Sequence, residues 1–381
     1  MKIHIVCGPF YPQLHPRAFR YTELAKEFIR NGHEVRVTNY VTIDGFNYDE
    51  YAKEIGIKEF IRLGIYHKAT KGDGPVSTRT KYPKLVKIRH LLTEYFLGGS
   101  TPYRSLILSK KLKIEPDTDM IIAGSTPFIT IFGTSFYLKN HKFSNSTTLV
   151  ADSGDPYYYS SQNKRGPWFK ILEERAYKQF DYLSIPVETA IPCYDRLLPK
   201  HKIRVIPQGL NMKDLKLYNG EFSKPVKFAY CGVFYMNIRN PEFLFSFLDA
   251  QDLEFEFHLF MRYQEPAFTD MLNKYPKLKS KTIIVNSLER DKLIYELSRM
   301  DFLVNISNLS NTQIPSKLID YGITKRPIYD CNEENFDSIK LLDFLNGNYH
   351  DSLQVDISKY DIARVAQQFI DLYNEKNKNL I

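Results

Sequence analysis

The chain has 381 residues and a formal net charge of +8, and 43% of its residues are hydrophobic. This length exceeds one ordinary hydrophobic core, so we expect two domains. No apolar run reaches about 18 residues, so no membrane-spanning helix is predicted; the basic charge allows phosphorylated substrates, nucleic acid or an anionic membrane as partners without choosing among them.

The four cysteines, Cys7, Cys193, Cys231 and Cys331, are far apart in the sequence and show no metal-ligand spacing. Such cysteines are typical of reduced, buried thiols, and no cleavable apolar segment follows the first strand. We therefore expect a cytoplasmic protein without a metal site. Zinc-finger spacing, an aromatic RNA-binding motif and a basic arm are all missing from the sequence, so nucleic acid is not a predicted partner.

The opening residues predict a strand, a helix and a second strand. An apolar strand over 2–7 ends in a turn that begins at Gly8, and a helix with an apolar period of 3.6 follows from Arg17. The next strand covers 34–40, so this β-α-β unit predicts a parallel sheet with a right-handed crossover. Arg17 and Arg20, in the first turns of the helix, either contact an anion or face solvent.

A basic and aromatic stretch follows in the first half of the chain. Residues 68–89 contain seven Lys or Arg and one acid, and Tyr and Phe side chains follow up to position 97. This composition favours peripheral contact with the inner face of a membrane or with a lipid diphosphate. A solvated loop explains the same composition, and both interpretations stay open.

Two aspartates follow a predicted core strand over 148–151. Asp152 and Asp155 lie where that strand ends, in the sequence Asp-Ser-Gly-Asp-Pro. Loops at the carboxyl ends of parallel strands are where open α/β sheets bind ligands. Either aspartate is therefore a candidate to face a substrate, with Asp155 preferred, although capping of a turn or helix is an equal alternative.

The second half of the chain predicts another parallel sheet. A polar stretch over 212–224 is typical of a linker, and a strand over 226–232 begins the new sheet. The opening IVCGPFY and the later AYCGVFY share a strand followed by Cys-Gly, one residue and Phe-Tyr. Two similar openings indicate two similar domains.

The segment over 301–330 organises the second domain. A short apolar strand over 302–306 precedes a polar loop, and a helix is expected to start with Ser316 as N-cap and to stop at Gly322. Lys317 would lie in the first turn, where the helix dipole disfavours a cation but free N–H groups attract anions. Asp320 is three residues further along the same face, so either a surface Lys–Asp pair or a diphosphate and ribose site is indicated.

The sequence PSKLIDY followed by TKRPI resembles the donor segment of GT-B glycosyltransferases, especially the retaining family 4 type of bacterial surface-polysaccharide biosynthesis. The strand start GHEVRV and the segment IRVIPQGLN are similar to two further motifs of the same group. The resemblance implies an α/β fold of two Rossmann-like domains that face a cleft. It also implies domains at 1–210 and 211–365, with a last helix over 366–381 that packs back on the first domain.

The resemblance assigns donor-binding roles to residues of the second domain. Arg239, Lys317 and Ser316 match positions that hold the donor diphosphate, and Asp320 matches the acid that contacts the ribose. Thr312 stands where the family usually has its first Glu, so it is a candidate contact to donor or acceptor.

In the first domain the resemblance implies catalytic contacts from Asp155, with Asp152 as second choice. Arg17 and Gly8 are candidate contacts to donor or acceptor near the first strand.

The predicted function is transfer of a hexosyl group from a nucleotide sugar, UDP-linked, to a glycan or lipid-linked saccharide with retention and without a cofactor or metal. Three alternatives stay open: an inactive sugar-nucleotide-binding partner subunit, a GT-B sugar-nucleotide 2-epimerase, and a basic RNA-binding protein supported by charge alone.

Overall fold

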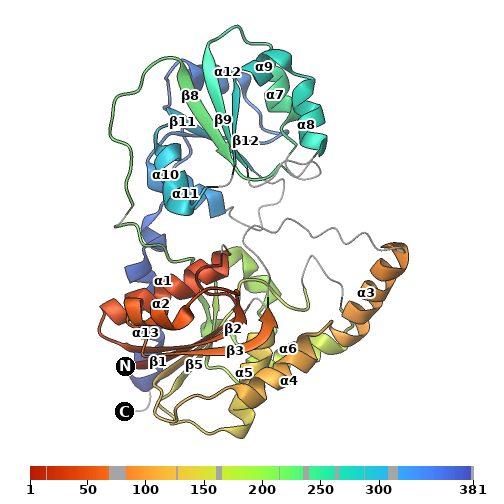
Figure 1. The fold of residues 1–381 in the computed structure, drawn as a ribbon, viewed down its shortest axis with the longest axis vertical. Coiled ribbons are helices and arrows are strands. Elements are labelled where there is room, and N and C mark those ends of the chain that lie inside the picture. The colour runs from red at the N-terminus through yellow and green to blue at the C-terminus, as the bar shows by residue number, and fades with distance from the viewer. Residues whose placement is uncertain are drawn as a thin grey trace. The chain divides into compact units, whose positions relative to one another are not determined.

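The computed structural model describes residues 1–13, 15–67, 83–125, 128–159, 165–213, 215–234, 240–261, 266–286, 288–307 and 316–378. The chain forms two compact units, shown in Figure 1. Unit 1 is Met1–Asn211 together with Tyr360–Ile381, and unit 2 is Met212–Lys359. The sequence had suggested a division after 210 and a return at 366; in the structure the chain crosses after Asn211 and returns at Tyr360.

Unit 1 contains a seven-stranded sheet in the order β3-β2-β1-β4-β5-β6-β7. All neighbouring strands are parallel, and the order reverses direction between β1 and β4. The strands are β1 (Lys2–Cys7), β2 (Glu34–Thr42), β3 (Glu59–His67), β4 (Met120–Gly124), β5 (Thr148–Asp152), β6 (Tyr182–Ile185) and β7 (Ile203–Val205).

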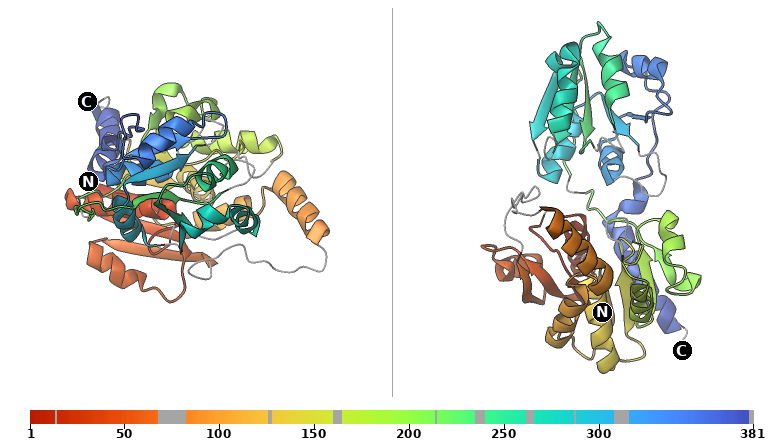
Figure 2. Two further views of the ribbon diagram at one scale, coloured as in Figure 1. Left: turned by 90° about the horizontal axis from the view of Figure 1, so that it is seen from above. Right: turned by 90° about the vertical axis from the view of Figure 1, so that its right-hand side faces the viewer.

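Helices cover both faces of this sheet, which explains why its central strands are apolar along their whole length. One core joins alternate residues of β1 to α1 (Pro16–Arg30), α2 (Tyr48–Ile55) and α13 (Ile362–Lys378). The opposite face packs against α4 (Thr101–Lys111), α5 (Ile129–Asn140) and α6 (Trp168–Tyr177). α3 (Pro83–Leu97) precedes α4, and short 3-10 helices lie at Glu188–Cys193 and Lys200–Lys202; Figure 2 gives two further views.

Unit 2 contains a five-stranded parallel sheet in the order β10-β9-β8-β11-β12, with the same reversal between β8 and β11. The strands are β8 (Val226–Cys231), β9 (Phe255–Met261), β10 (Thr282–Asn286), β11 (Phe302–Ile306) and β12 (Ile328–Cys331). The helices are α7 (Glu242–Asp249), α8 (Pro266–Asn273), α9 (Pro276–Ser280), α10 (Arg290–Ser298), α11 (Ser316–Thr324) and α12 (Ser338–Leu345), with a 3-10 helix at Ser358–Tyr360. The two parallel sheets confirm the predicted α/β class with two Rossmann-like domains.

One predicted helix end is wrong, because α11 continues through Gly322 to Thr324. A Cβ at Gly322 would lie 2.4 Å from Cγ2 of Ile357, so this glycine provides close packing rather than a stop. α13 begins at Ile362, and its N-terminus is capped by the Asp361 carboxylate, which accepts from the Ala363 N–H at 2.9 Å.

Candidate functional site

In unit 2 the sheet order reverses between β8 and β11, and open α/β sheets bind ligands outside the carboxyl ends of strands at such a point. Tyr321 of α11, which is fully buried, fixes this edge. Its hydroxyl accepts from the backbone N–H of Cys231 at 2.7 Å and donates to the Val304 carbonyl oxygen at 3.1 Å. α11 is therefore anchored to both strands at the switch point through its second turn.

Lys317, in the first turn of α11, brings a cation to this switch point. Its side chain is only 8% exposed. The ammonium donates to the carbonyl oxygen of Ile306, the last residue of β11, at 3.4 Å, and lies 4.2 Å from the centroid of the Tyr230 ring. A carbonyl dipole and an aromatic face are suitable partners for a desolvated ammonium. A positive charge is thus held beside the N-terminus of a helix, where anions bind.

Asp320 binds Arg290 of α10, a residue that the sequence analysis missed. The Arg290 Nε donates to Oδ1 of Asp320 at 3.0 Å, and its Nη2 donates to the same oxygen. Within the described part of the chain, no residue donates to Oδ2. Burial raises the pKa of Asp320, and the nearby Arg290 opposes that rise. A basic residue at the start of a helix 30 positions earlier gives no local signal, because the pairing depends on α10 packing against α11.

Three predicted donor residues fall partly or wholly outside this description. Arg239 and Thr312 lie outside the described residues, as does the side chain of Ser316, whose backbone begins α11. Their assigned roles therefore stay predictions from the sequence.

Other polar groups at the carboxyl ends of the unit 2 strands give little sign of nucleophilic or metal chemistry. Burial raises the pKa of Cys231 to about 12, so its thiol is neutral near pH 7. Burial also raises the pKa of Asp330, which accepts a hydrogen bond from Asn305 on the neighbouring strand. Among the residues that the structure describes, no group of three His, Cys, Asp or Glu side chains could hold a metal ion.

In unit 1 the corresponding reversal lies between β1 and β4, and the next strand ends in Asp152. This carboxylate is 1% exposed and is bound by two guanidinium groups. Oδ2 accepts from Arg17 Nη1 at 3.1 Å and from Arg20 Nε at 2.8 Å, while Oδ1 accepts from Arg20 Nη2 and Ser184 Oγ, both at 2.8 Å. Burial opposes ionisation, but Arg20 and Arg17 outweigh it and lower the pKa of Asp152. Both arginines are buried, so the solvent-facing alternative for them is wrong.

Asp155 differs from Asp152 because its side chain is exposed in the turn after β5. Its backbone carbonyl accepts from the hydroxyl of Ser153 at 3.1 Å, which fixes the turn. Gly154 lies between them, and a Cβ there would be 1.8 Å from Nη2 of Arg17. The loop therefore packs its glycine on the Arg17 guanidinium and leaves the Asp155 carboxylate at the surface.

Gly8 follows β1 in a buried position. Its carbonyl oxygen accepts from Asn39 Nδ2 at 2.6 Å and from the Val41 N–H at 3.1 Å. These bonds tie the end of β1 to β2, so the Gly8 carbonyl has a structural function.

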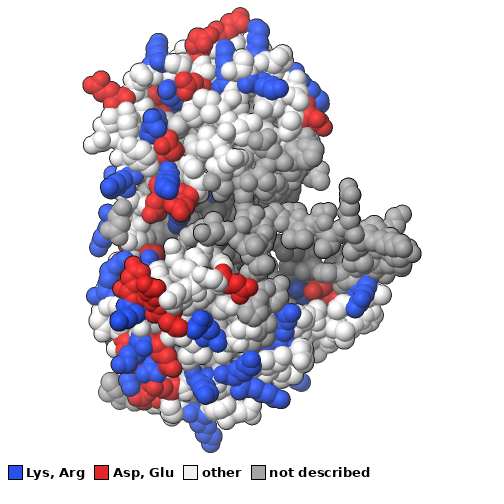
Figure 3. Space-filling view, viewed as in Figure 1, with Lys and Arg blue, Asp and Glu red and all other residues white. Residues whose placement is uncertain are grey.

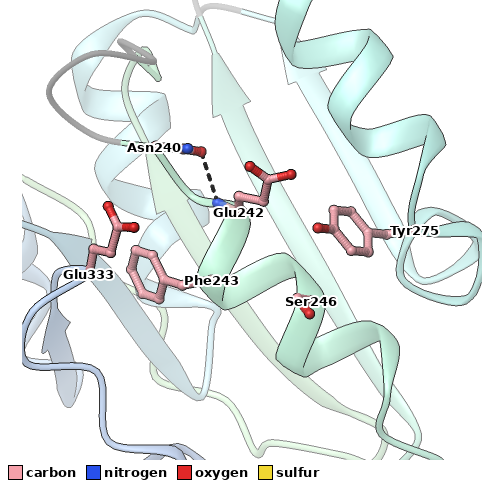
Figure 4. Close-up of a pocket in the computed structure, with 6 residues that line it drawn as sticks. All are labelled: Asn240, Glu242, Phe243, Ser246, Tyr275 and Glu333. Carbon is pink, nitrogen blue, oxygen red and sulfur yellow. Dashed lines mark hydrogen bonds between the residues drawn. The ribbon is translucent and has the colours of Figure 1, made fainter.

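Two cavities lie away from these switch-point residues. A cavity of about 250 Å³ in unit 2 is lined by Asn240, Glu242, Phe243, Ser246, Tyr275 and Glu333 (Figure 4). Its two carboxylates make it unsuitable for a diphosphate, and its volume is below the range of about 300–1,000 Å³ usual for ligand pockets. A larger cavity of about 790 Å³ in unit 1 includes His4, Arg36 and Glu59, which lie at the amino-terminal part of β1–β3, the opposite edge from the carboxyl ends.

Comparisons with known proteins support the fold. No family model and no curated protein matches the chain. Among solved structures, it resembles the lipopolysaccharide outer core galactosyltransferase WaaB (13% identity, 99% of this chain and 100% of that one, TM-score 0.55). It also resembles a putative UDP-N-acetylglucosamine 2-epimerase from Listeria monocytogenes (12%, 99% and 97%, 0.57) and Anabaena HepE in complex with UDP-glucose (11%, 100% and 99%, 0.53). The chain has the GT-B fold.

Proposed function

We propose that this protein is a GT-B glycosyltransferase that moves a hexosyl group from a UDP-sugar to a glycan or lipid-linked saccharide, with retention of configuration. The position of Lys317 carries the proposal: its ammonium lies at the carboxyl end of β11, 3.4 Å from the Ile306 carbonyl oxygen, in the first turn of α11. Cations and helix N-termini are the groups that bind diphosphates in proteins.

The donor site is assigned to unit 2. Lys317, Ser316 and the N–H groups of the first turn of α11 would hold the diphosphate, with Arg239 as a second cation. Asp320 would accept from a ribose hydroxyl through Oδ2, since Arg290 occupies Oδ1. The UDP-glucose complex of a protein with the same fold supports a uridine nucleotide.

The chemistry needs stabilisation of the departing diphosphate. The acceptor oxygen forms a bond to the anomeric carbon as the bond from that carbon to the phosphate oxygen breaks, and the acceptor proton passes to the departing diphosphate. Charge develops on the leaving group, and a cation already in place stabilises it without reorganisation. Two parts of the proposal, retention of configuration and independence from a metal, are based on the family resemblance.

The acceptor side is assigned to unit 1, in the order Asp155, Arg17 and Asp152. Asp155 is exposed, so its carboxylate can contact a sugar. Asp152 is buried and saturated by Arg17 and Arg20, so we assign it the role of positioning Arg17. Gly8 and Thr312 stay candidate contacts for donor or acceptor.

The first experiment is thermal unfolding with UDP, GDP, CMP and ADP. One nucleotide is expected to stabilise the protein as RT ln(1 + [L]/Kd). Lys317→Ala should weaken the binding of that nucleotide by about 10- to 100-fold, because charge-assisted hydrogen bonds contribute about 1.5–3 kcal/mol. Lys292→Ala is the matched control, since that lysine is 72% exposed and pairs only with Glu289 among described residues. Stabilisation by no nucleotide, or equal stabilisation of the Lys317 variant, would contradict the donor site.

The epimerase fold of the Listeria neighbour keeps a second function open. NMR of the UDP-sugar separates the possibilities. A transferase releases UDP and this release increases with acceptor, whereas an epimerase inverts C2 without any acceptor. A binding subunit without activity would be stabilised by the nucleotide sugar but would leave it intact.

A further inference from the structure

Unit 1 has an exposed apolar surface that the proposed transfer reaction does not use. Six large side chains form it: Leu91, Leu92, Tyr95, Phe96 and Leu97 of α3, and Trp168 of α6. They are 39–63% exposed. Single exposed apolar residues are common on protein surfaces, but a contiguous group of large ones marks an interaction site. This group is called the α3 patch below.

Ring contacts make the α3 patch continuous across two helices. The Trp168 ring centroid lies 5.7 Å from that of Tyr95 and 5.9 Å from that of Phe96, on which it stacks. Leu91 and Leu92 precede these two rings by four residues, which places each leucine on the same face of α3 as one ring.

Polar contacts hold this end of α3 against the start of α6. The N–H of Gly166 donates to the Tyr95 carbonyl oxygen at 2.9 Å, and Glu94 forms an ion pair with Arg165 at 3.5 Å. The arrangement of exposed rings is therefore fixed by backbone and charge contacts. It is a preformed surface and not an isolated helix end.

Exposed cations lie next to the α3 patch along the chain, because Arg89 precedes Leu91 by two residues and Lys170 follows Trp168 by two. Residues 89–113 and 165–178 contain nine Lys or Arg and three acids. Each acid forms an ion pair: Glu94 with Arg165, Glu173 with Arg196, and Glu174 with Lys178. Basic side chains gather over the part of unit 1 that α4 occupies (Figure 3). The exposed Arg89, Lys110, Lys111 and Lys170 belong to these segments.

An anionic lipid surface fits this chemistry better than a second copy of the chain. A two-fold interface places the same patch on both partners, so the basic surroundings would repel each other. Aromatic and leucine side chains with Lys and Arg beside them are the composition that binds at the headgroup layer of anionic membranes. No helix in the described segments is long and apolar enough to cross a membrane, so the contact would be peripheral.

We propose that the α3 patch docks unit 1 on an anionic membrane surface, with its rings and leucines in the headgroup layer and the neighbouring Arg89 and Lys170 against lipid phosphates. This proposal does not depend on the sugar-transfer function. From the membrane interpretation of residues 68–97 it keeps only the described end of α3, since residues 68–82 lie outside the described chain, and it adds Trp168 of α6.

Trp168 is the only tryptophan of the protein, so its fluorescence reports on the patch without labelling. The full-length protein is mixed with vesicles of phosphatidylcholine alone, or with about 30% phosphatidylglycerol. We expect a blue shift of the emission and quenching by brominated lipid chains with the anionic vesicles, and co-sedimentation that decreases as salt is added.

The test variant is Leu91→Glu/Leu92→Glu, which leaves Trp168 and its ring neighbours intact. We expect vesicle binding at least about tenfold weaker, because two apolar side chains leave the headgroup layer and two like charges face the lipid. Ile339→Glu is the control, as Ile339 is 73% exposed on α12 of unit 2 and should bind like the wild type.

Several results would overturn the proposal. One is equal binding to vesicles with and without anionic lipid, or no quenching with either. Another is a dimer in sedimentation analysis that Leu91→Glu/Leu92→Glu converts to monomer while vesicles leave Trp168 unquenched, which would assign the α3 patch to self-association. The proposal would also be excluded if the double variant bound anionic vesicles as strongly as the wild type. Circular dichroism checks that the double variant is folded.

Discussion

The two switch points of this protein have the same strand order and different charge chemistry. In unit 1, the Asp152 carboxylate binds Arg17 at 3.1 Å and Arg20 at 2.8 Å, all three side chains being buried. In unit 2, Lys317 contacts a carbonyl oxygen and an aromatic ring. The carboxylate one turn later, Asp320, binds Arg290 instead.

Buried ion pairs with saturated oxygens fix the shape of a loop, and removing one partner leaves an uncompensated charge. The Lys317 ammonium contacts a carbonyl dipole and an aromatic ring, and under the proposed function it would also face the donor diphosphate. On that proposal, the ion pairs in unit 1 hold a loop in place, and the cation in unit 2 takes part in donor binding.

The largest expected effect comes from Asp152→Ala. Removing this carboxylate leaves two buried guanidinium groups without their counterion, so the free energy of unfolding should fall by about 3–5 kcal/mol. Urea unfolding followed by Trp168 fluorescence measures this in unit 1. Asp117→Ala is the control, since its ion pair with Lys2 is exposed and should contribute at most about 1 kcal/mol. Similar losses from both variants would remove the contrast between a buried and a surface pair.

Asp320→Ala tests the other switch point through ligand affinity instead of stability. If Oδ2 accepts from a ribose hydroxyl, the variant should bind UDP about 10- to 100-fold more weakly, because a hydrogen bond to a charged group contributes about 1.5–3 kcal/mol. Isothermal titration with UDP and with an analogue that lacks both ribose hydroxyls measures the difference. The wild type and the variant should bind the analogue equally. A parallel loss for both ligands would show that Asp320 acts only through Arg290.

Gly154→Ala and Gly322→Ala compare the close packing at the two sites. A methyl group at Gly154 would meet the Arg17 guanidinium, and one at Gly322 would meet Ile357. Each should lower the free energy of unfolding by about 1–3 kcal/mol, with the smaller loss at Gly322 because alanine favours the helix. A double-mutant cycle is the check: the loss from Gly154→Ala should disappear in an Arg17→Ala background. An unchanged loss there would exclude Arg17 as the cause.

The two carboxylates, Asp320 and Asp152, should take up protons at different pH values, because their pKa values are shifted in opposite directions. The pKa of Asp320 is raised and that of Asp152 is lowered relative to their ordinary value of 3.8. The stability from Asp152 is present above that value and is lost as pH falls below it. Asp320 takes up its proton at higher pH, so UDP affinity should decrease before Trp168 reports unfolding. Asp320→Asn should remove this early decrease, and unfolding that precedes the loss of affinity would contradict the order.

Several core strands could be predicted from the sequence, because each is a short apolar run with clear ends. β3 (Glu59–His67) was not predicted. The strands Lys2–Cys7 and Phe302–Ile306 were predicted with the observed bounds. Helix ends were harder, since Gly322 has the local signature of a stop and is instead a packing position. Tertiary contact decided that position, which no local pattern reveals.

The partners of the candidate site residues could not be predicted. Asp152 pairs with arginines 132 and 135 positions earlier, and Arg290 reaches Asp320 over 30 positions. A sequence shows which side chains follow the carboxyl ends of strands, and the sheet order then decides which of them meet. Lys317 was found because its helix position is unusual for a cation, a signal that Arg290 lacks.

The course of the chain through the two units has a consequence for synthesis on the ribosome. Leu210, on the way out of unit 1, is hydrogen-bonded to Tyr360 and Ile362 on the way back. α13 then supplies Val365 and Phe369 to the core beneath α1. Unit 2 is thus complete in the nascent chain before unit 1, although it starts later. Domains usually finish folding in N-terminal order; here part of the core of unit 1 stays uncovered until α13 has been synthesised.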